Sequence, residues 1–107
     1  MPLNGLTKMT KIEVVVAGEH APAVREQFQS AGATGFTSVS GVSGFGHHGY
    51  HQGRLLFNQQ AALEMLITVV PEAKVEALTA GLRRLLEDSP GVMFVTDTYV
   101  SRPEYFS

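Results

Sequence analysis

The alternation of apolar and polar residues predicts a strand followed by a helix in the first third of the chain. Apolar residues occupy every second position from Ile12 to Val16, which predicts a strand that ends near Gly18. From about residue 20 to 31, apolar residues recur every three or four positions, which predicts a helix that the following glycine ends. Residues 1–10 lack either period, and we expect them to form a flexible leader before the domain.

Two further strands are predicted in the middle of the chain. Residues 36–42 are rich in β-branched and small side chains, which favours a strand, and Gly41 predicts a bulge within it. Residues 59–66 have a helix-forming composition, but apolar and other residues alternate regularly over 63–69. We give the period more weight than the composition and predict a third strand there.

A second helix and a fourth strand complete the pattern. The helix begins at Pro71, and the strand covers residues 92–100, before a tail at 101–107. The order is therefore β-α-β, a long loop, and β-α-β. This order predicts an α+β fold of the ferredoxin-like βαββαβ type, with an antiparallel sheet and a single domain over 11–107.

One face of this sheet is predicted to lack helices. Right-handed crossovers place both helices on the other face. The uncovered face is expected to carry five apolar residues beside two charged ones: Val15, Ala17, Ala62, Leu66 and Val70, with Lys11 and Glu13. Such a face favours a homo-oligomer packed sheet to sheet, and scattered surface apolar residues are the alternative.

Composition narrows the class of protein. The chain has 107 residues, of which 17% are charged, with a net charge of −2 and no cysteine. These values predict one domain and argue against disulfides, thiol chemistry and a nucleic-acid partner. No stretch has the length or flanks of a secretory signal or a membrane span, so we expect a cytoplasmic protein without membrane insertion.

Glycines and histidines gather in one segment that could carry chemistry. Residues 43–53 read SGFGHHGYHQG, and Arg54 is the only charged side chain from Gln27 to Leu63. Glycines at 44, 46 and 49 match the spacing of a dinucleotide-binding fingerprint, but no helix begins inside the motif and the chain is short for that fold. The glycines can still let backbone N–H groups approach an anion, and a loop without a ligand is the alternative.

The histidines suggest a second class of function. His47, His48 and His51 could assist a small metal- or histidine-dependent hydrolase, with Ser40 or Ser43 as the nucleophile. Carboxylates that could orient them lie far away in sequence, at positions 64 and 97. Neither a thiolate nor a carboxylate lies near the histidines, so we expect no metal site and no catalytic residue.

The sequence resembles the PII signal-transduction family over about residues 11–100. The resemblance is carried by TGFT at 34–37, by GFG at 44–46 at the start of a long loop, and by ITVVP at 67–71 before the second helix. The segment GFGHHGYHQG and the C-terminal SRPEYF resemble the PII-like branch associated with carboxysomes.

This resemblance implies a non-enzymatic homotrimer that binds adenine nucleotides between subunits and bicarbonate with them. It signals by ordering the T-loop, about residues 43–60, on a partner such as a bicarbonate transporter or a carboxysome-related protein. The nucleotide-binding residues implied are Thr37, Ser43, Gly44, Phe45, Gly46, His47 and Arg102. Three of them, Phe45, His47 and Arg102, are implied for bicarbonate.

Two departures from the family change the ligand and the regulation that we expect. Residues 88–91 replace a longer phosphate loop that carries a lysine, so ADP or AMP is expected to bind better than ATP. Phe57 and Asn58 stand where the family has its tyrosine segment, which argues against uridylylation. A structural module without any ligand is the remaining alternative.

Overall fold

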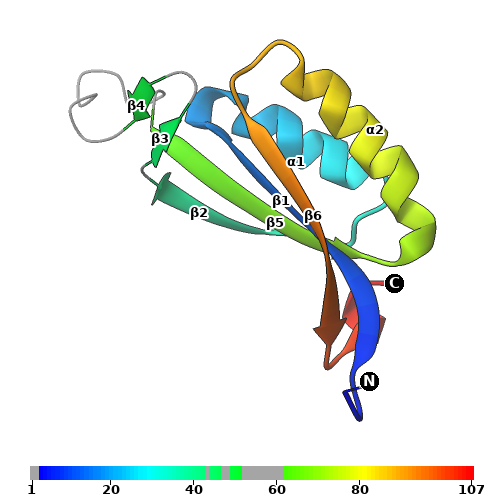
Figure 1. The fold of residues 1–107 in the computed structure, drawn as a ribbon. Helices are drawn as coiled ribbons and strands as arrows, with labels where there is room; N and C mark the ends of the chain where they lie inside the picture. The colour runs from blue at the N-terminus through cyan, green and yellow to red at the C-terminus, as the bar shows by residue number, and fades with distance from the viewer. Residues whose placement is uncertain (1–2, 43, 47–48, 52–61) are drawn as a thin grey trace.

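The fold consists of one four-stranded antiparallel sheet with two helices packed on it (Figure 1). This computed structural model describes the chain except residues 1–2, 43, 47–48 and 52–61. The main strands are β1 (Thr7–Ala17), β2 (Thr37–Val42), β5 (Leu63–Val70) and β6 (Val92–Val100). The helices are α1 (Ala21–Ser30) and α2 (Val75–Leu86), each preceded by a short 3-10 turn, η1 (Gly18–His20) and η4 (Glu72–Lys74). A further 3-10 turn, η5 (Pro103–Tyr105), lies in the tail.

The strand order β2-β5-β1-β6 confirms the predicted ferredoxin-like topology. Strand β1 lies at the centre and pairs antiparallel with both β5 and β6. The fourth strand has the predicted bounds, but the first begins earlier than expected. Thr7 pairs with Val100, so residues 7–10 belong to the sheet and not to a leader. Because β1 pairs with the long strand β6, it extends beyond the residues in which apolar positions alternate.

The core lies between the sheet and the two helices. Ten buried side chains form it: Ile12, Val14, Val16, Ala21, Val24, Phe28, Leu66, Val70, Leu78 and Leu82. Gly32 ends α1 with a φ of 95°, a left-handed backbone conformation that glycine adopts without strain. In the described part of the chain, no helix is long and apolar enough to cross a membrane.

The prediction for the two faces of β5 was wrong. Leu66 and Val70 are buried beneath the helices, and not on the uncovered face. Both alternating sets of β5 are rich in apolar residues, so the period alone could not tell which set faces the helices. The helix side also holds Glu64, which accepts a hydrogen bond from Arg25 of α1, and Thr68, whose hydroxyl donates to a backbone carbonyl. These partners make polar residues tolerable beneath the helices.

The uncovered face is therefore more apolar than expected. Within one strand, side chains alternate between the two faces of a sheet. The β5 residues opposite to the buried set are Leu63, Met65, Ile67 and Val69. Val39 of β2, Val92 and Phe94 of β6 and Val15 of β1 lie on the same face by register, and the first three are 42%, 50% and 53% exposed. A single chain thus presents an apolar sheet face to water.

A bulge and a small hairpin lead out of the sheet from β2. Gly41 has a φ of 73° where the β2–β5 register shifts between Ser40 and Val42, which confirms the predicted bulge. Beyond β2, β3 (Gly44–Gly46) and β4 (Gly49–His51) form a two-stranded antiparallel hairpin. The hairpin lies at the end of the sheet opposite to the chain termini (Figure 1).

Candidate functional site

The predicted site residues Arg102 and Gly44–Gly46 lie at opposite ends of the molecule. The first is at the narrow end that holds both termini (Figure 1). There the Thr34 hydroxyl donates a hydrogen bond of 2.7 Å to the carbonyl oxygen of Tyr105. The Arg102 Nη1 donates to the Tyr105 hydroxyl at 3.2 Å, and the guanidinium carbon lies 5.6 Å from the ring centroid. Thr37 begins β2 three residues after Thr34, but it pairs with Ile67, which pairs with Glu13 in the middle of β1. Thr37 therefore lies part-way along the sheet, between Arg102 and the hairpin.

The segment before β2 is fixed by side chains from the sheet and from the 3-10 turn η4. Thr68 is 2% exposed, and its hydroxyl donates to the carbonyl oxygen of Gly35 at 2.6 Å. The Lys74 ammonium donates to the carbonyl oxygen of Gly32 at 2.7 Å. Because both ends of this short segment are bonded to the folded body, the surface that it forms with the tail is preorganised for a ligand.

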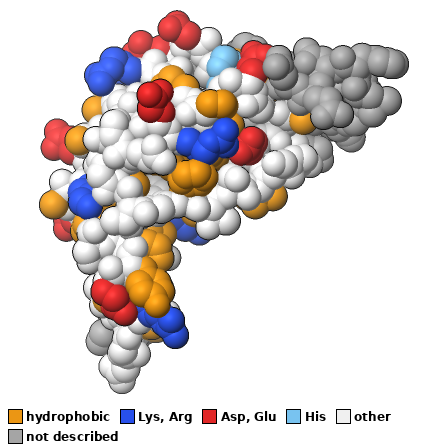
Figure 2. All heavy atoms as spheres, turned by 180° about the vertical axis from the view of Figure 1, so that it is seen from behind, with side chains coloured by type: hydrophobic (Ala, Val, Ile, Leu, Met, Phe, Trp, Pro, Cys, Tyr) orange, Lys and Arg blue, Asp and Glu red, His pale blue; other side chains and the backbone are white. Residues whose placement is uncertain are grey.

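The surface at this end mixes an aromatic ring with charge. Tyr105 is 60% exposed, and Arg102 and Glu104 beside it are exposed as well. Figure 2 shows hydrophobic, basic and acidic side chains next to one another at the narrow end. An exposed guanidinium held beside an aromatic ring suits the anionic group of a ligand.

The second group of predicted residues lies at the base of the long loop. The backbone of Gly44, Phe45 and Gly46 forms β3, and Gly44 pairs with His51. Ser43 and His47 lie outside the described residues, as does most of the predicted T-loop. The return of the loop into β5 is bonded to the body, since Gly18 N–H donates to the carbonyl oxygen of Ala62 at 2.7 Å.

A single chain does not bring these two groups together. Strand β2 separates them, because the tail is bonded to Thr34, before the first residue of β2, and the hairpin follows its last residue. Six residues of extended strand span about 20 Å. A ligand the size of a nucleoside monophosphate cannot touch Arg102 and Gly44 of the same chain across that distance. A site made of both groups requires a second copy of the chain.

The described residues do not assemble the hydrolase alternative. Glu64 binds Arg25 at 3.0 Å at one end of the sheet, and Asp97 pairs with Lys8 at 3.5 Å at the other. His51 lies in the small hairpin, while His47 and His48 are outside the described part of the chain. Among the residues that the structure describes, no cluster of three or more potential ligands could hold a metal ion.

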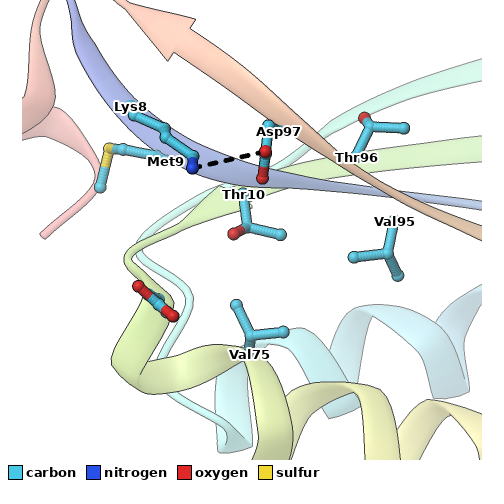
Figure 3. Close-up of a pocket in the computed structure, with 8 residues that line it drawn as sticks. Lys8, Met9, Thr10, Val75, Val95, Thr96 and Asp97 are labelled. Atoms are coloured by element: carbon cyan, nitrogen blue, oxygen red, sulfur yellow. Dashed lines mark ion pairs between the residues drawn. The ribbon is translucent and has the colours of Figure 1, made fainter.

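A cavity of about 450 Å³ is lined by none of the predicted site residues. It opens between the start of α2, at Val75, and the β1–β6 pair, where the Lys8–Asp97 ion pair sits at its edge (Figure 3). The two side chains are 60% and 67% exposed, so water screens their attraction. No residue of this cavity was predicted to bind a ligand.

Comparison with known proteins places the fold in a family. The model of the nitrogen regulatory protein P-II family matches residues 9–105, which is most of the chain. The chain belongs to the PII family. No curated protein sequence matches it significantly.

Solved structures of PII-like proteins resemble the chain along nearly its whole length. CPII from Thiomonas intermedia K12, bound to ADP, AMP and bicarbonate, is 39% identical with a TM-score of 0.87, covering 94% of this chain and 95% of CPII. A second CPII structure, bound to ADP and bicarbonate, is 36% identical with a TM-score of 0.84, covering 95% and 97%. The GlnK–ATP complex of B. subtilis shares the fold, with 20% identity, a TM-score of 0.60, and coverage of 91% and 85%.

Sequence reasoning missed the residues that fix the segment before β2 and its contact with the tail. Thr34, Thr68 and Lys74 act through bonds to backbone atoms that lie 71, 33 and 42 positions away in the chain. No short sequence pattern predicts a hydrogen bond over such a separation. The one available signal was Thr68, a polar residue with apolar neighbours on both sides in the strand.

Proposed function

We propose that this PII-family protein is a non-enzymatic sensor that binds an adenine nucleotide together with bicarbonate at the contact between two subunits. The observation that carries the proposal is the position of its two half-sites, Arg102 in the tail at one end of the sheet and the Gly44–Gly46 backbone at the other, with Thr37 part-way between them. CPII, at 39% identity, is bound to ADP, AMP and bicarbonate, and it supplies the ligand class.

The chemistry of the two half-sites supports this ligand. Glycines at 44 and 46 carry no side chain, so a phosphate can approach the backbone of the loop base closely. Arg102 offers a planar guanidinium for an anion, and its exposure keeps it accessible to a ligand from a neighbouring subunit. We assign Thr37 to the nucleoside, and Phe45, His47 and Arg102 to bicarbonate.

The apolar face of the sheet supports a homotrimer that joins the half-sites. Leu63, Met65, Ile67 and Val69 line this face without a helix to cover them. Packing of three such faces would remove apolar surface from water, which stabilises association. It would also allow the tail end of one subunit to lie beside the loop base of the next.

Signalling would then depend on the T-loop. Ligand bound at the base of the loop changes the free energy of its ordered state, so it can shift the loop towards a conformation that a partner recognises. We propose a partner in inorganic-carbon metabolism, such as a bicarbonate transporter or a carboxysome-related protein. The connection at residues 88–91, between α2 and β6, is short and carries no lysine that could pair with an additional phosphate. ADP or AMP should therefore bind more tightly than ATP.

Titration calorimetry tests this function. We expect the purified chain to bind ADP, to bind it more tightly in bicarbonate than in chloride of equal ionic strength, and to bind ATP more weakly. Gly46→Ala should weaken ADP binding, because the added methyl group obstructs the approach of a phosphate. Arg102→Gln should do the same, while Arg83→Gln, an exposed arginine on α2, should not. Absence of ADP binding to the unaltered chain would refute the proposal.

A further inference from the structure

The guanidinium of Arg102 is held by an aromatic side chain of its own tail. Its Nη1 donates to the Tyr105 hydroxyl at 3.2 Å, and its central carbon lies 5.6 Å from the centroid of the same ring. A hydrogen bond and a cation–π contact therefore act together on one side chain. An exposed arginine otherwise samples many rotamers, and a ligand must restrict them when it binds.

The backbone that carries Tyr105 is itself fixed. The residue ends the 3-10 turn η5, where its N–H donates to the carbonyl oxygen of Arg102 at 3.0 Å. Its own carbonyl oxygen accepts the 2.7 Å hydrogen bond from Thr34. Neither bond uses the tyrosine side chain, so replacing the ring leaves both in place.

The contact orients Arg102 without neutralising it. In the part of the chain that the structure describes, no carboxylate lies within ion-pair distance of this guanidinium. A carboxylate partner would hold the arginine but would also compete with an anionic ligand for its charge. The tyrosine hydroxyl occupies one donor of a guanidinium that has five, and leaves the positive charge available.

We propose that Tyr105 is a positioning residue that presents Arg102 to the anionic group of the bound ligand. This inference rests on the proposed nucleotide site. It adds the residue that determines how strongly the Arg102 guanidinium binds the anionic group of the ligand. The ring acts through Arg102, so its removal should matter only while the arginine is present. A ring that stacked on the adenine would instead contribute whether or not the arginine was there.

A double-mutant cycle on the full chain separates these two roles. The dissociation constant for ADP is measured by calorimetry for the unaltered chain, Tyr105→Leu, Arg102→Gln and the double variant. We expect Tyr105→Leu to weaken ADP binding about tenfold, since it removes a charged hydrogen bond and a cation–π contact. In the Arg102→Gln background the same change should have almost no effect. If that background binds too weakly to measure, Arg102→Lys takes its place because it keeps the charge.

Two further variants show whether the effect is specific. Tyr105→Phe keeps the ring and should weaken ADP binding about threefold, between the unaltered chain and Tyr105→Leu. Tyr99→Leu is the matched control, because Tyr99 is also an exposed tyrosine, at 42%, but lies within β6. It should bind ADP like the unaltered chain. Native mass spectrometry and a melting curve check that each variant keeps its assembly and its fold.

The possible results divide cleanly. If Tyr105→Leu lowers the affinity for ADP equally in the unaltered chain and in the Arg102→Gln variant, Tyr105 acts on the ligand directly and the inference is overturned. Unchanged ADP binding in Tyr105→Leu or in Arg102→Gln overturns it as well, but leaves the proposed function standing. Failure of the unaltered chain to bind ADP refutes the proposed function itself.

Discussion

A single lysine on the uncovered sheet face should dissociate the proposed trimer. Phe94 of β6 lies on this face and is 53% exposed in the single chain. Its partner across the strand pair is Glu13, which is half-buried. Phe94→Lys therefore places opposite charges across from each other, an arrangement that antiparallel strands tolerate well. We expect the isolated subunit to keep its fold.

The magnitude follows from the area that association would cover. A phenylalanine has roughly 200 Å² of surface, about half of which is exposed at Phe94. Covering about 100 Å² at about 25 cal/mol per Å² contributes about 2.5 kcal/mol per subunit. Loss of this term in three subunits lowers the association free energy by about 7.5 kcal/mol, or roughly five to six orders of magnitude in the association constant. Desolvation and mutual repulsion of three ammonium groups add to this loss.

Sedimentation velocity or native mass spectrometry at micromolar concentration measures the outcome. We expect a trimer for the unaltered chain and a monomer for Phe94→Lys. Val95→Lys is the matched control, because Val95 is 44% exposed, lies next in sequence and faces the helix side of the same strand. It should remain trimeric. A Phe94→Lys chain that stays trimeric, or an unaltered chain that is monomeric throughout, would refute the role given to this face.

Three further substitutions test the packing that positions the half-sites. Thr68→Val removes the hydroxyl that donates to the Gly35 carbonyl, so it should lower the free energy of unfolding by about 1 kcal/mol and the Tm by about 4–8 °C. An unchanged melting curve would contradict this. Gly91→Ala brings a methyl carbon to 2.6 Å from a Val16 methyl group, so urea unfolding should show a free energy of unfolding lower by about 1–3 kcal/mol. Stability equal to that of the unaltered chain would contradict the close approach. Gly41→Ala meets no neighbouring atom but must adopt a φ of 73°, so it should lower the free energy of unfolding by about 1–2 kcal/mol, and Gly41→Asn should lower it less. Equal losses in the two variants would contradict a conformational cause.

Periodicity decided most of the fold because secondary structure responds to local patterns. Strand β6 has the predicted bounds, and Gly41 lies at a bulge as expected. A strand forms over 63–70 although residues 59–66 have a helix-forming composition, since its partners on both sides, β1 and β2, stabilise an extended chain. The alternation did not determine which side of β5 faces the helices, because that depends on the partners of Glu64 and Thr68.

The site was only partly predictable for a related reason. The sequence by itself determined the residue types, with glycines at the loop base and an arginine beside a tyrosine in the tail. Only the tertiary structure decided that Thr34 would bond Tyr105 across 71 positions, and that Arg102 would lie at the far end of β2 from Gly44. Hydrogen bonds over such separations depend on how the whole sheet folds, and no short window of sequence contains both partners.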